Sequence, residues 1–521
     1  MTRYDAVVVG GGHNGLTAAA YLAKAGRSVL VLERREVLGG ACVTEELFPG
    51  FRLNVASYTV GMLQPEVIGE LGLGDVGFRS YVRDPQFTGV FPDGQHLVVY
   101  PDLERTVADV ARLSRNDALA WPRFEADGAR VGAILRDHFL RPAADWGWGD
   151  FARAFTGAES ERLFARFILG TTRDLVDSYF ESDAVKGVQA FGGAVGTFVG
   201  PSTPGSAYSK AHHLAARVGD HLGCFGYIKG GMGALSEALA AVLRRHGGEI
   251  RTKAAVERVI VRDGAAVGVV LAGGEEIAAR VVVSNADPRH TLLGLVGERA
   301  LEPGVVADLE RYRTTGCSYK INCALDALPR FRAVPPGDQA PYLQGGVVIS
   351  PSLDYLETAY REARAGRVPR RPYVIIHFQT ITDPELAPPG KHTMTLYGDW
   401  VPYQPADGPW TPERRRAFAE DVLDTVAEHA PNVRDVLRDY MILVPPDIEA
   451  RFNITGGNIF HGDLTLEQLF SLRPIPGFGA HRMPVASLYL CGSGSHPGGY
   501  VSGLPGRNAA TVVLQDLQRG R

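Results

Sequence analysis

Three glycines near the start of the chain have the spacing of a loop that binds a dinucleotide phosphate. They are Gly10, Gly12 and Gly15, in the run Gly-Gly-Gly-His-Asn-Gly. The first permits a tight turn, the second lets the backbone approach a pyrophosphate, and the third allows a helix to pack closely on a strand. Glu33 stands eighteen residues beyond Gly15. A carboxylate at that distance can hydrogen-bond both ribose hydroxyls of an adenine nucleotide.

Two strands and a helix must hold this loop. Residues 4–9 (Tyr-Asp-Ala-Val-Val-Val) predict a buried strand that runs straight into the glycines. Apolar residues at positions 16, 19, 20 and 23 predict a helix, and residues 28–32 predict a second strand that ends at Glu33. The glycine spacing by itself is weak evidence and could mark a structural turn. Together with the strands, the helix and the acid it predicts a dinucleotide-binding unit.

A second glycine pair indicates that the dinucleotide is FAD. Gly39 and Gly40 follow Glu33 with the spacing E-x(5)-G-G, which is typical of flavoproteins. Such a pair turns backbone N–H groups toward the phosphates and the ribitol, although a plain loop remains the alternative. We expect Arg34, next to Glu33, to contact the cofactor as well.

One residue in this region bears on redox chemistry. Cys42 follows the glycine pair, but Leu47 stands where a C-x(4)-C motif needs its second thiol. A disulfide relay requires that second sulfur. We therefore expect Cys42 to be a packed, unreactive thiol and not a catalytic one.

Two later stretches predict further parts of the same domain. Residues 226–284 predict a helix, a hairpin that begins at Val256, and a strand, and residues 488–510 predict a strand, a glycine-dense turn and the start of a helix. We expect Val256, Gly492, Ser493 and Val501 to contact the cofactor, since turns of this kind aim backbone donors at a phosphate or a flavin ring. No second G-x-G-x-x-G opens a βαβ unit. This disfavours an NAD(P)H domain and favours oxygen or a quinone as the electron acceptor.

These segments predict an α/β fold in which separated parts of the chain form one Rossmann-like FAD-binding domain. Residues 1–65, 223–300 and 455–521 are assigned to it. Residues 66–222 and 301–454 are assigned to an α+β substrate domain that caps the flavin and forms the substrate cavity.

Composition excludes several other classes. Lys and Arg number 54 and Asp and Glu 58, a net charge of −4, which argues against a nucleic-acid partner. Five cysteines without a Cys-x-x-Cys pair argue against a disulfide-stapled fold and a zinc ribbon, and we expect no metal site. No signal peptide precedes the first strand, so we expect a cytoplasmic protein. Five arginines within residues 361–371 predict a solvated face, with peripheral contact to an anionic membrane as the alternative.

The motifs above, with others along nearly the whole chain, resemble those of the phytoene desaturase/carotenoid isomerase-like FAD oxidoreductases. Within that family they look most like the subgroup called pyridine nucleotide-disulphide oxidoreductase domain-containing protein 2. The resemblance implies a glutathione reductase-type FAD fold, non-covalent FAD and a buried, largely apolar cavity. The stretches that carry it are residues 12–16, 43–46, 49–51, 204–208, 212–213, 229–235, 457–462, 491–494 and 496–499.

Two further residues resemble positions in the related flavin amine oxidases. Lys320 resembles the lysine that holds a water at flavin N5, and Tyr500 resembles a tyrosine that stands over the flavin face. We take both as candidate catalytic residues. A solvent-exposed lysine at a strand edge and a packed aromatic are the alternatives. His213 and His461 are weaker candidates, since a single histidine is more often a hydrogen-bonded core residue.

Three functions remain open. The first is hydride transfer from a hydrophobic polyene or isoprenoid-like substrate to flavin N5, which introduces or shifts a double bond. The second is an amine or amino-acid oxidase, which Lys320 and Tyr500 would favour. The third is a protein that retains FAD without turning over. The substrate assignment depends on the family resemblance, because a fold hosts many chemistries.

Overall fold

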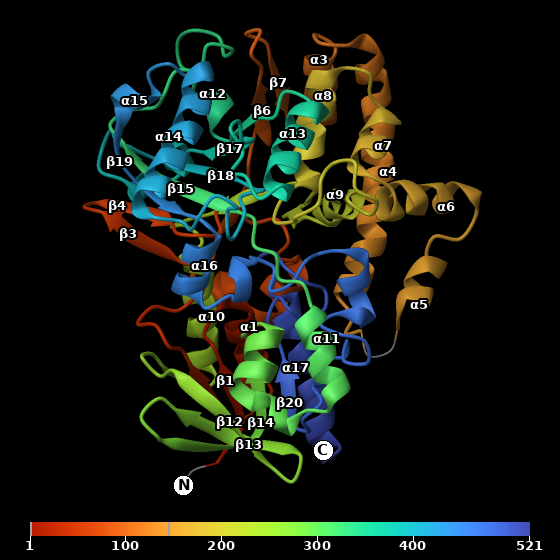
Figure 1. Cartoon of the computed structure of the whole chain (residues 1–521), viewed down its shortest axis with the longest axis vertical. Coiled ribbons are helices and arrows are strands. Elements are labelled where there is room, and N and C mark those ends of the chain that lie inside the picture. The colour runs from red at the N-terminus through yellow and green to blue at the C-terminus, as the bar shows by residue number, and fades with distance from the viewer. Residues whose placement is uncertain (1–2, 144–145, 521) are drawn as a thin grey trace.

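Two seven-stranded sheets organise residues 3–143 and 146–520, which are the residues that the computed structural model describes. Figure 1 shows the strands β12–β14 of the first sheet near the two termini and the strands β15–β19 of the second at the other end of the long axis. A block of helices that includes α4, α6 and α7 lies along one side.

The first sheet has the order β11-β2-β1-β14-β13-β12, with β20 paired to β14. Its pairs β1–β2, β1–β14, β2–β11 and β14–β20 are parallel, whereas β12–β13 and β13–β14 are antiparallel. The predicted hairpin is thereby confirmed. The strands are β1 (Tyr4–Val9), β2 (Val29–Leu32), β11 (Glu249–Arg251), β12 (Val256–Arg262), β13 (Ala265–Leu271), β14 (Glu276–Ser284) and β20 (Leu488–Leu490).

Alternation along β1 explains why this sheet is buried on both faces. Ala6 and Val8 point into one apolar cluster, and Val7 and Val9 point into another on the opposite face. The first cluster includes the apolar sides of the helices α1 (His13–Lys24), α10 (Gly233–Arg245) and α17 (Leu504–Gln518), with α10 and α17 packed against α1. The predicted strand–loop–helix–strand unit is confirmed.

The second sheet has the order β19-β15-β18-β17-β16-β6-β7. The helices α13 (Leu353–Arg364) and α14 (Pro412–His429) belong to the same part of the chain, and α14 packs its apolar stripe into the core of the sheet. The strands are β6 (Phe87–Val90), β7 (His96–Val99), β15 (Tyr319–Leu325), β16 (Val347–Ile349), β17 (Val374–His377), β18 (His392–Gly398) and β19 (Leu437–Leu443).

The helical block lies between β7 and the segment that returns to the first sheet. Its helices are α3 (Leu103–Val110), α4 (Arg115–Phe139), α5 (Trp148–Arg153), α6 (Ala158–Phe164), α7 (Thr172–Asp177), α8 (Asp183–Ala190) and α9 (Ala207–Leu214). The remaining α-helices are α2 (Pro65–Leu71), α11 (Pro303–Arg311), α12 (Ala340–Leu343), α15 (Val433–Val436) and α16 (Pro445–Phe452). Three two-stranded antiparallel pairs complete the strands: β3 (Thr44–Phe48) with β4 (Phe51–Asn54), β5 (Ser80–Val82) with β10 (Gly226–Ile228), and β8 (Arg217–Val218) with β9 (His221–Leu222).

The strands of the first sheet all fall in residues 1–65, 223–300 and 455–521, and those of the second fall in 66–222 and 301–454. The residue boundaries given for the cofactor domain and the capping domain stay a prediction. The helices of the described residues include none that is both long and apolar enough to cross a bilayer.

Candidate active site

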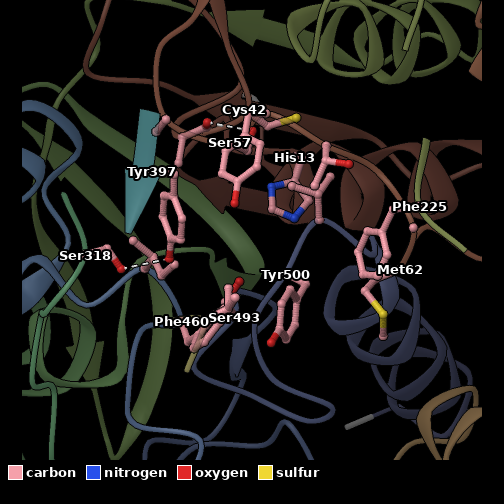
Figure 2. A pocket seen from close by; sticks show the side chains of 18 of the residues that line it. His13, Cys42, Ser57, Met62, Phe225, Ser318, Tyr397, Phe460, Ser493 and Tyr500 are labelled. Carbon is pink, nitrogen blue, oxygen red and sulfur yellow. Dashed lines mark hydrogen bonds between the residues drawn. The ribbon is translucent and has the colours of Figure 1, made fainter. Parts of the chain in front are cut away.

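A cavity of about 480 Å³ lies where the two sheets meet, and residues from both line it. This volume falls within the range of ligand pockets. One end is formed by the loop after β1 and by the carboxyl ends of β2 and β14. The other end is lined by β15, β17 and β18 and by the helical block. In Figure 2, Ser318 and Tyr397 lie on one wall, Met62 and Phe225 lie on the other, and Tyr500 lies between them.

The glycine loop leaves no room for side chains. A Cβ on Gly15 would lie 2.3 Å from the carbonyl oxygen of Gly10, and a Cβ on Gly12 would lie 2.5 Å from Nδ2 of Asn285. Both separations are shorter than a van der Waals contact. The loop therefore presents bare backbone to the cavity at the start of α1, where helix N–H groups lack intrahelical partners.

Polar atoms beside this loop are also left without protein partners. Nε2 of His13 and Oδ1 of Asn14 are buried and have no hydrogen-bond partner among the described residues, and both residues line the cavity. Nδ2 of Asn14 donates to Oγ of Ser493, 3.2 Å away. Buried polar groups are otherwise almost always paired, so this end of the cavity is built for a polar ligand.

Glu33 lies at the carboxyl end of β2, as the sequence predicts, with 6% of its surface exposed. Its carboxylate accepts hydrogen bonds from the backbone N–H groups of Gly11 and Arg35, both at 2.8 Å. These bonds fix the carboxylate at the cavity wall, and each oxygen keeps a further acceptor site. Arg34 lies at the exposed rim and donates to the carbonyls of Ala450 and Arg451.

The predicted glycine pair closes over the loop. The N–H of Gly39 donates to the carbonyl of Gly11 at 2.8 Å, and Gly39 has a φ of +112° that favours glycine. Gly40 lines the cavity beside it. Cys42 is buried, its Sγ donates to the carbonyl of Met232, and burial raises the pKa of the thiol to about 11. Such a thiol is not a nucleophile near neutral pH, as expected.

The carboxyl-terminal turn reaches the same loop through β20. Ser493 and Val501 line the cavity, as does Val256 at the start of β12. Gly492 does not line it, and a Cβ there would lie 2.5 Å from the carbonyl oxygen of Asn285. Gly492 thus permits two chain segments to pack closely. Whether Gly492 also contacts the cofactor stays a prediction.

A buried arginine holds this turn in place. Arg473 is fully buried and donates to the carbonyl of Ser493 through Nε at 3.1 Å and through Nη2 at 2.8 Å. Its other bonds go to the carbonyls of Phe460, Gly462, Asp463 and Gln468. The guanidinium therefore ties together backbone that no regular secondary structure satisfies.

Lys320 lies on β15, in the interior of the second sheet. Alternation along the strand puts Tyr319 and Ile321 into the sheet's core, while Lys320 and Asn322 face the other way. The Nζ of Lys320 donates to the carbonyls of Asn54 and Ala56, and the side chain lines the cavity with 3% of its surface exposed. Burial holds its pKa well below the usual value. The alternative of an exposed strand-edge lysine is wrong.

A buried carboxylate lies behind the same wall. Asp399, just after β18, accepts hydrogen bonds from the hydroxyls of Ser318 at 2.5 Å, Tyr397 at 3.0 Å and Tyr373. Ser318 and Tyr397 line the cavity, and their hydroxyl oxygens are 3.1 Å apart. Burial raises the pKa of Asp399 to about 6.

Comparison with known proteins decides the family. Residues 15–320 match the model of the flavin containing amine oxidoreductases. A rat protein, pyridine nucleotide-disulfide oxidoreductase domain-containing protein 2, is 37% identical over 99% of this chain and 94% of its own length. The chain belongs to the flavin containing amine oxidoreductase family. Within it, the chain is a phytoene desaturase-like FAD oxidoreductase close to the rat protein, as its motifs predict.

Two further likenesses agree with this membership. The neurosporene-forming phytoene desaturase of Cereibacter sphaeroides is 27% identical over 98% of this chain and 94% of its own length. A structure of putrescine oxidase bound to putrescine has a TM-score of 0.64 at 15% identity, and it covers 99% of this chain and 100% of the oxidase. The predicted α/β fold with an FAD domain and a substrate domain is confirmed, and the flavin oxidoreductase depends on FAD.

The residues of the flavin oxidoreductase fit that cofactor. The bare glycine loop and the unpartnered ring nitrogen of His13, which can donate, suit a diphosphate, and Glu33 suits a ribose. Asn285 has no counterpart among the residues singled out in the sequence, although its side chain fills the space beside Gly10, Gly12 and Gly15. Its place at the carboxyl end of β14 is the signal that could have found it, because ligands bind where parallel strands end.

Tyr500 lines the cavity of the flavin oxidoreductase and is also packed. Its ring centroid lies 4.6 Å from that of Phe460 and 4.8 Å from those of His212 and His213. Burial lowers the pKa values of His213 and His461 to about 4, so both are neutral near pH 7. Their participation in catalysis stays a prediction, as does that of Tyr500.

Sequence reasoning missed the buried polar groups of the capping side. Asp399, Arg473 and Arg83 stand in no motif, and only the fold brings them to the cavity or to the turn beside it. The five arginines of residues 361–371 are exposed, and Arg361 and Arg371 pair with Glu357 and Glu428. Contact of this face with a membrane stays a prediction.

Proposed function

We propose that this flavin oxidoreductase removes a hydride from carbon in a hydrophobic, polyene or isoprenoid-like substrate, in a desaturase- or isomerase-like reaction. The observation that carries the proposal is the continuity of the cavity, which joins the glycine loop to a chamber of apolar and aromatic side chains. The phytoene desaturase relative supports this substrate class. Oxygen or a quinone is the proposed acceptor of the electrons.

The cofactor contacts follow from the geometry. The backbone of Gly10, Gly12 and Gly15 and the start of α1 would hold the diphosphate, and Glu33 the ribose. Gly39, Gly40, Ser493 and Val501 line the cavity or the loop beside it and would border the rest of the cofactor, with Arg34 and Val256 at the adenosine end. Gly492 would contribute by close packing.

Desaturation of a carbon–carbon single bond removes one hydride and one proton from neighbouring carbons. FAD, when bound, supplies the hydride acceptor at N5. The proton needs a base, and Asp399 with the hydroxyls of Ser318 and Tyr397 forms a hydrogen-bonded path from the cavity to a buried carboxylate. We propose that a substrate proton passes to Tyr397 or Ser318 while the hydroxyl proton passes to Asp399. The cavity walls contribute by excluding water and by positioning the substrate.

The test is anaerobic reduction of the flavin by candidate substrates. Phytoene and shorter isoprenoid polyenes in detergent are mixed with the purified holoprotein, and the flavin absorbance is followed. Bleaching by a polyene, with a product that contains an added or shifted double bond, supports the proposal. Reduced protein is then mixed with air or with a quinone, and the faster reoxidation identifies the acceptor. Failure of all polyenes to bleach a flavin that a chemical reductant does bleach would contradict it.

An amine oxidase is the second candidate, because Lys320 and Tyr500 both line the cavity. The same anaerobic assay with a panel of primary amines separates the two functions. Bleaching by an amine, with release of an aldehyde and ammonia after air is admitted, favours the oxidase. If neither class reduces the flavin, the third function, an FAD-retaining binding protein, is favoured.

A further inference from the structure

Arg83 is a buried cation on the cavity wall that has no acidic partner. It follows β5, is 8% exposed and lines the cavity. Its backbone N–H donates to the carbonyl of Phe225, and its carbonyl accepts from the side chain of Gln86, so its position is fixed. No ion pair joins its guanidinium to a carboxylate anywhere in residues 3–143 and 146–520.

The groups around this guanidinium leave one of its N–H donors without an acceptor. One Nη lies 3.4 Å from Nδ1 of His377, and the guanidinium carbon lies 5.8 Å and 5.7 Å from the ring centroids of Phe225 and Tyr227. Nε is buried and has no partner within the described part of the chain. A buried charge with an unused donor is costly unless a ligand pairs with it.

The chamber around Arg83 carries more positive than negative groups. Lys210 also lines it and donates to the amide oxygen of Gln189. Lys320 lines the cavity too and donates to backbone carbonyls, and its lowered pKa favours the neutral amine. Glu125 is the acid that lines this end, and burial raises its pKa, which favours its neutral form. The excess of donors and positive charge favours an anionic ligand.

Apolar groups complete the walls of the same chamber. Phe87 and Phe191 stack edge to face at 5.4 Å, and Trp121 and Phe124 lie 6.3 Å apart, all four on the cavity surface. A ligand that fits has an apolar body and one anionic group. A planar carboxylate matches the fork of an arginine, with two parallel N–H···O bonds.

We propose that Arg83 binds a carboxylate of the substrate, so that the substrate is an apolar carboxylic acid; this rests on the proposed function of the same cavity. The position favours chemistry close to the carboxylate. His377 contacts Arg83, the ring of Tyr58 lies 4.9 Å from that of His377, and the ring of Tyr397 lies 5.1 Å from that of Tyr58. This row connects the carboxylate site to the hydroxyl of Tyr397, which contacts Asp399.

The test measures binding, which needs no turnover. Decanoate, 1-decanol and decylamine are titrated into the holoprotein, and binding is followed by the shift of the flavin absorption band and by calorimetry. We expect decanoate to bind about tenfold or more tightly than 1-decanol, because a hydrogen bond to a charged group is worth more than one to a neutral group. Decylamine should bind no better than the alcohol. Equal binding of decanoate and decanol would overturn the proposal without any variant.

Variants assign the effect to Arg83. Arg83→Met keeps an unbranched apolar stem without the guanidinium and should abolish the preference for decanoate, and Arg83→Lys should keep part of it. Arg79→Met is the matched control, since Arg79 is exposed and lies outside the cavity. A preference that survives in a yellow, folded Arg83→Met protein would overturn the assignment. Decanoate binding by a protein whose flavin no polyene reduces would contradict the proposed reaction and leave the carboxylate site standing.

Discussion

Lys320 and Tyr397 face each other across the antiparallel strands β15 and β18, and both side chains line the cavity. Directly opposed residues of an antiparallel pair lie on the same face of the sheet. The register therefore places an amine with a lowered pKa beside a phenol that is hydrogen-bonded to a buried carboxylate. The two residues themselves are 77 positions apart in sequence.

Replacing Gly12 should remove the cofactor. We expect Gly12→Val to be isolated without FAD, because the new side chain would collide with Asn285 and cover the backbone that approaches the diphosphate. The measurement is the ratio of flavin to protein absorbance, with Gly304→Val as the control because a Cβ there meets nothing within 4 Å. A Gly12→Val protein that keeps stoichiometric FAD would refute the site.

The rate of flavin reduction should depend on the ionisation of Asp399. The carboxylate accepts a proton only when ionised, and its pKa is raised to about 6. The rate should therefore fall as the pH drops through about 6 and be level above it. Asp399→Asn should remove this dependence on pH and slow flavin reduction by about 10²–10⁴-fold. Tyr397→Phe should slow flavin reduction as well. Stopped-flow reduction between pH 5 and 8 is the measurement, and an unchanged profile in Asp399→Asn would rule out the proton path.

Lys320→Met should slow reaction of the reduced flavin with oxygen while FAD stays bound. The amine is a buried hydrogen-bond donor on the cavity wall, and methionine keeps most of the side chain's length without an N–H group. We expect a drop of about tenfold or more in the reoxidation rate, on the scale of a lost general acid. Lys391→Met, at an exposed ion pair with Asp326, is the control. Equal reoxidation rates in the two variants would indicate that Lys320 has only a structural role.

Arg473 should matter for stability more than any surface arginine. Arg473→Met leaves several buried carbonyls without donors, and each costs about 1–3 kcal/mol. We expect the free energy of unfolding to fall by about 3 kcal/mol or more, together with weaker FAD retention, because the turn at Ser493 loses its anchor. Chemical denaturation checks this against Arg299→Met, an exposed position. A loss below about 1 kcal/mol, the scale of a surface change, would contradict the anchoring role.

Cys42 should be dispensable for the redox reaction. Its pKa of about 11 keeps it protonated, and Cys42→Ser preserves a donor to the carbonyl of Met232. We expect this variant to keep its FAD and its rate of flavin reduction. In the native protein the thiol should resist a disulfide reagent at pH 8 and react only after unfolding. Rapid modification of native Cys42, with loss of activity, would reopen thiol chemistry.

Local sequence patterns were sufficient to predict the cofactor half of the molecule. Gly10, Gly12, Gly15 and Glu33 lie within thirty residues, and their strand, helix and second strand form as their periodicity predicts. Such a loop works through its own backbone, so a short stretch of sequence contains most of the information. Family membership and the need for FAD follow from the same kind of pattern.

The site residues of the capping half could be recognised only from the tertiary structure. The alternation Tyr-Lys-Ile-Asn-Cys on β15 shows that Lys320 faces away from the apolar side chains, but whether that face meets solvent or a cavity depends on which segments cover it. Asp399, Arg473 and Arg83 bear charges whose significance comes from their burial, which sequence patterns do not reveal. The cofactor, its loop and the fold class could be predicted from residues alone, because they depend on local patterns. The positions of the buried charges follow from the fold, since desolvation and hydrogen bonding arise only when distant segments pack.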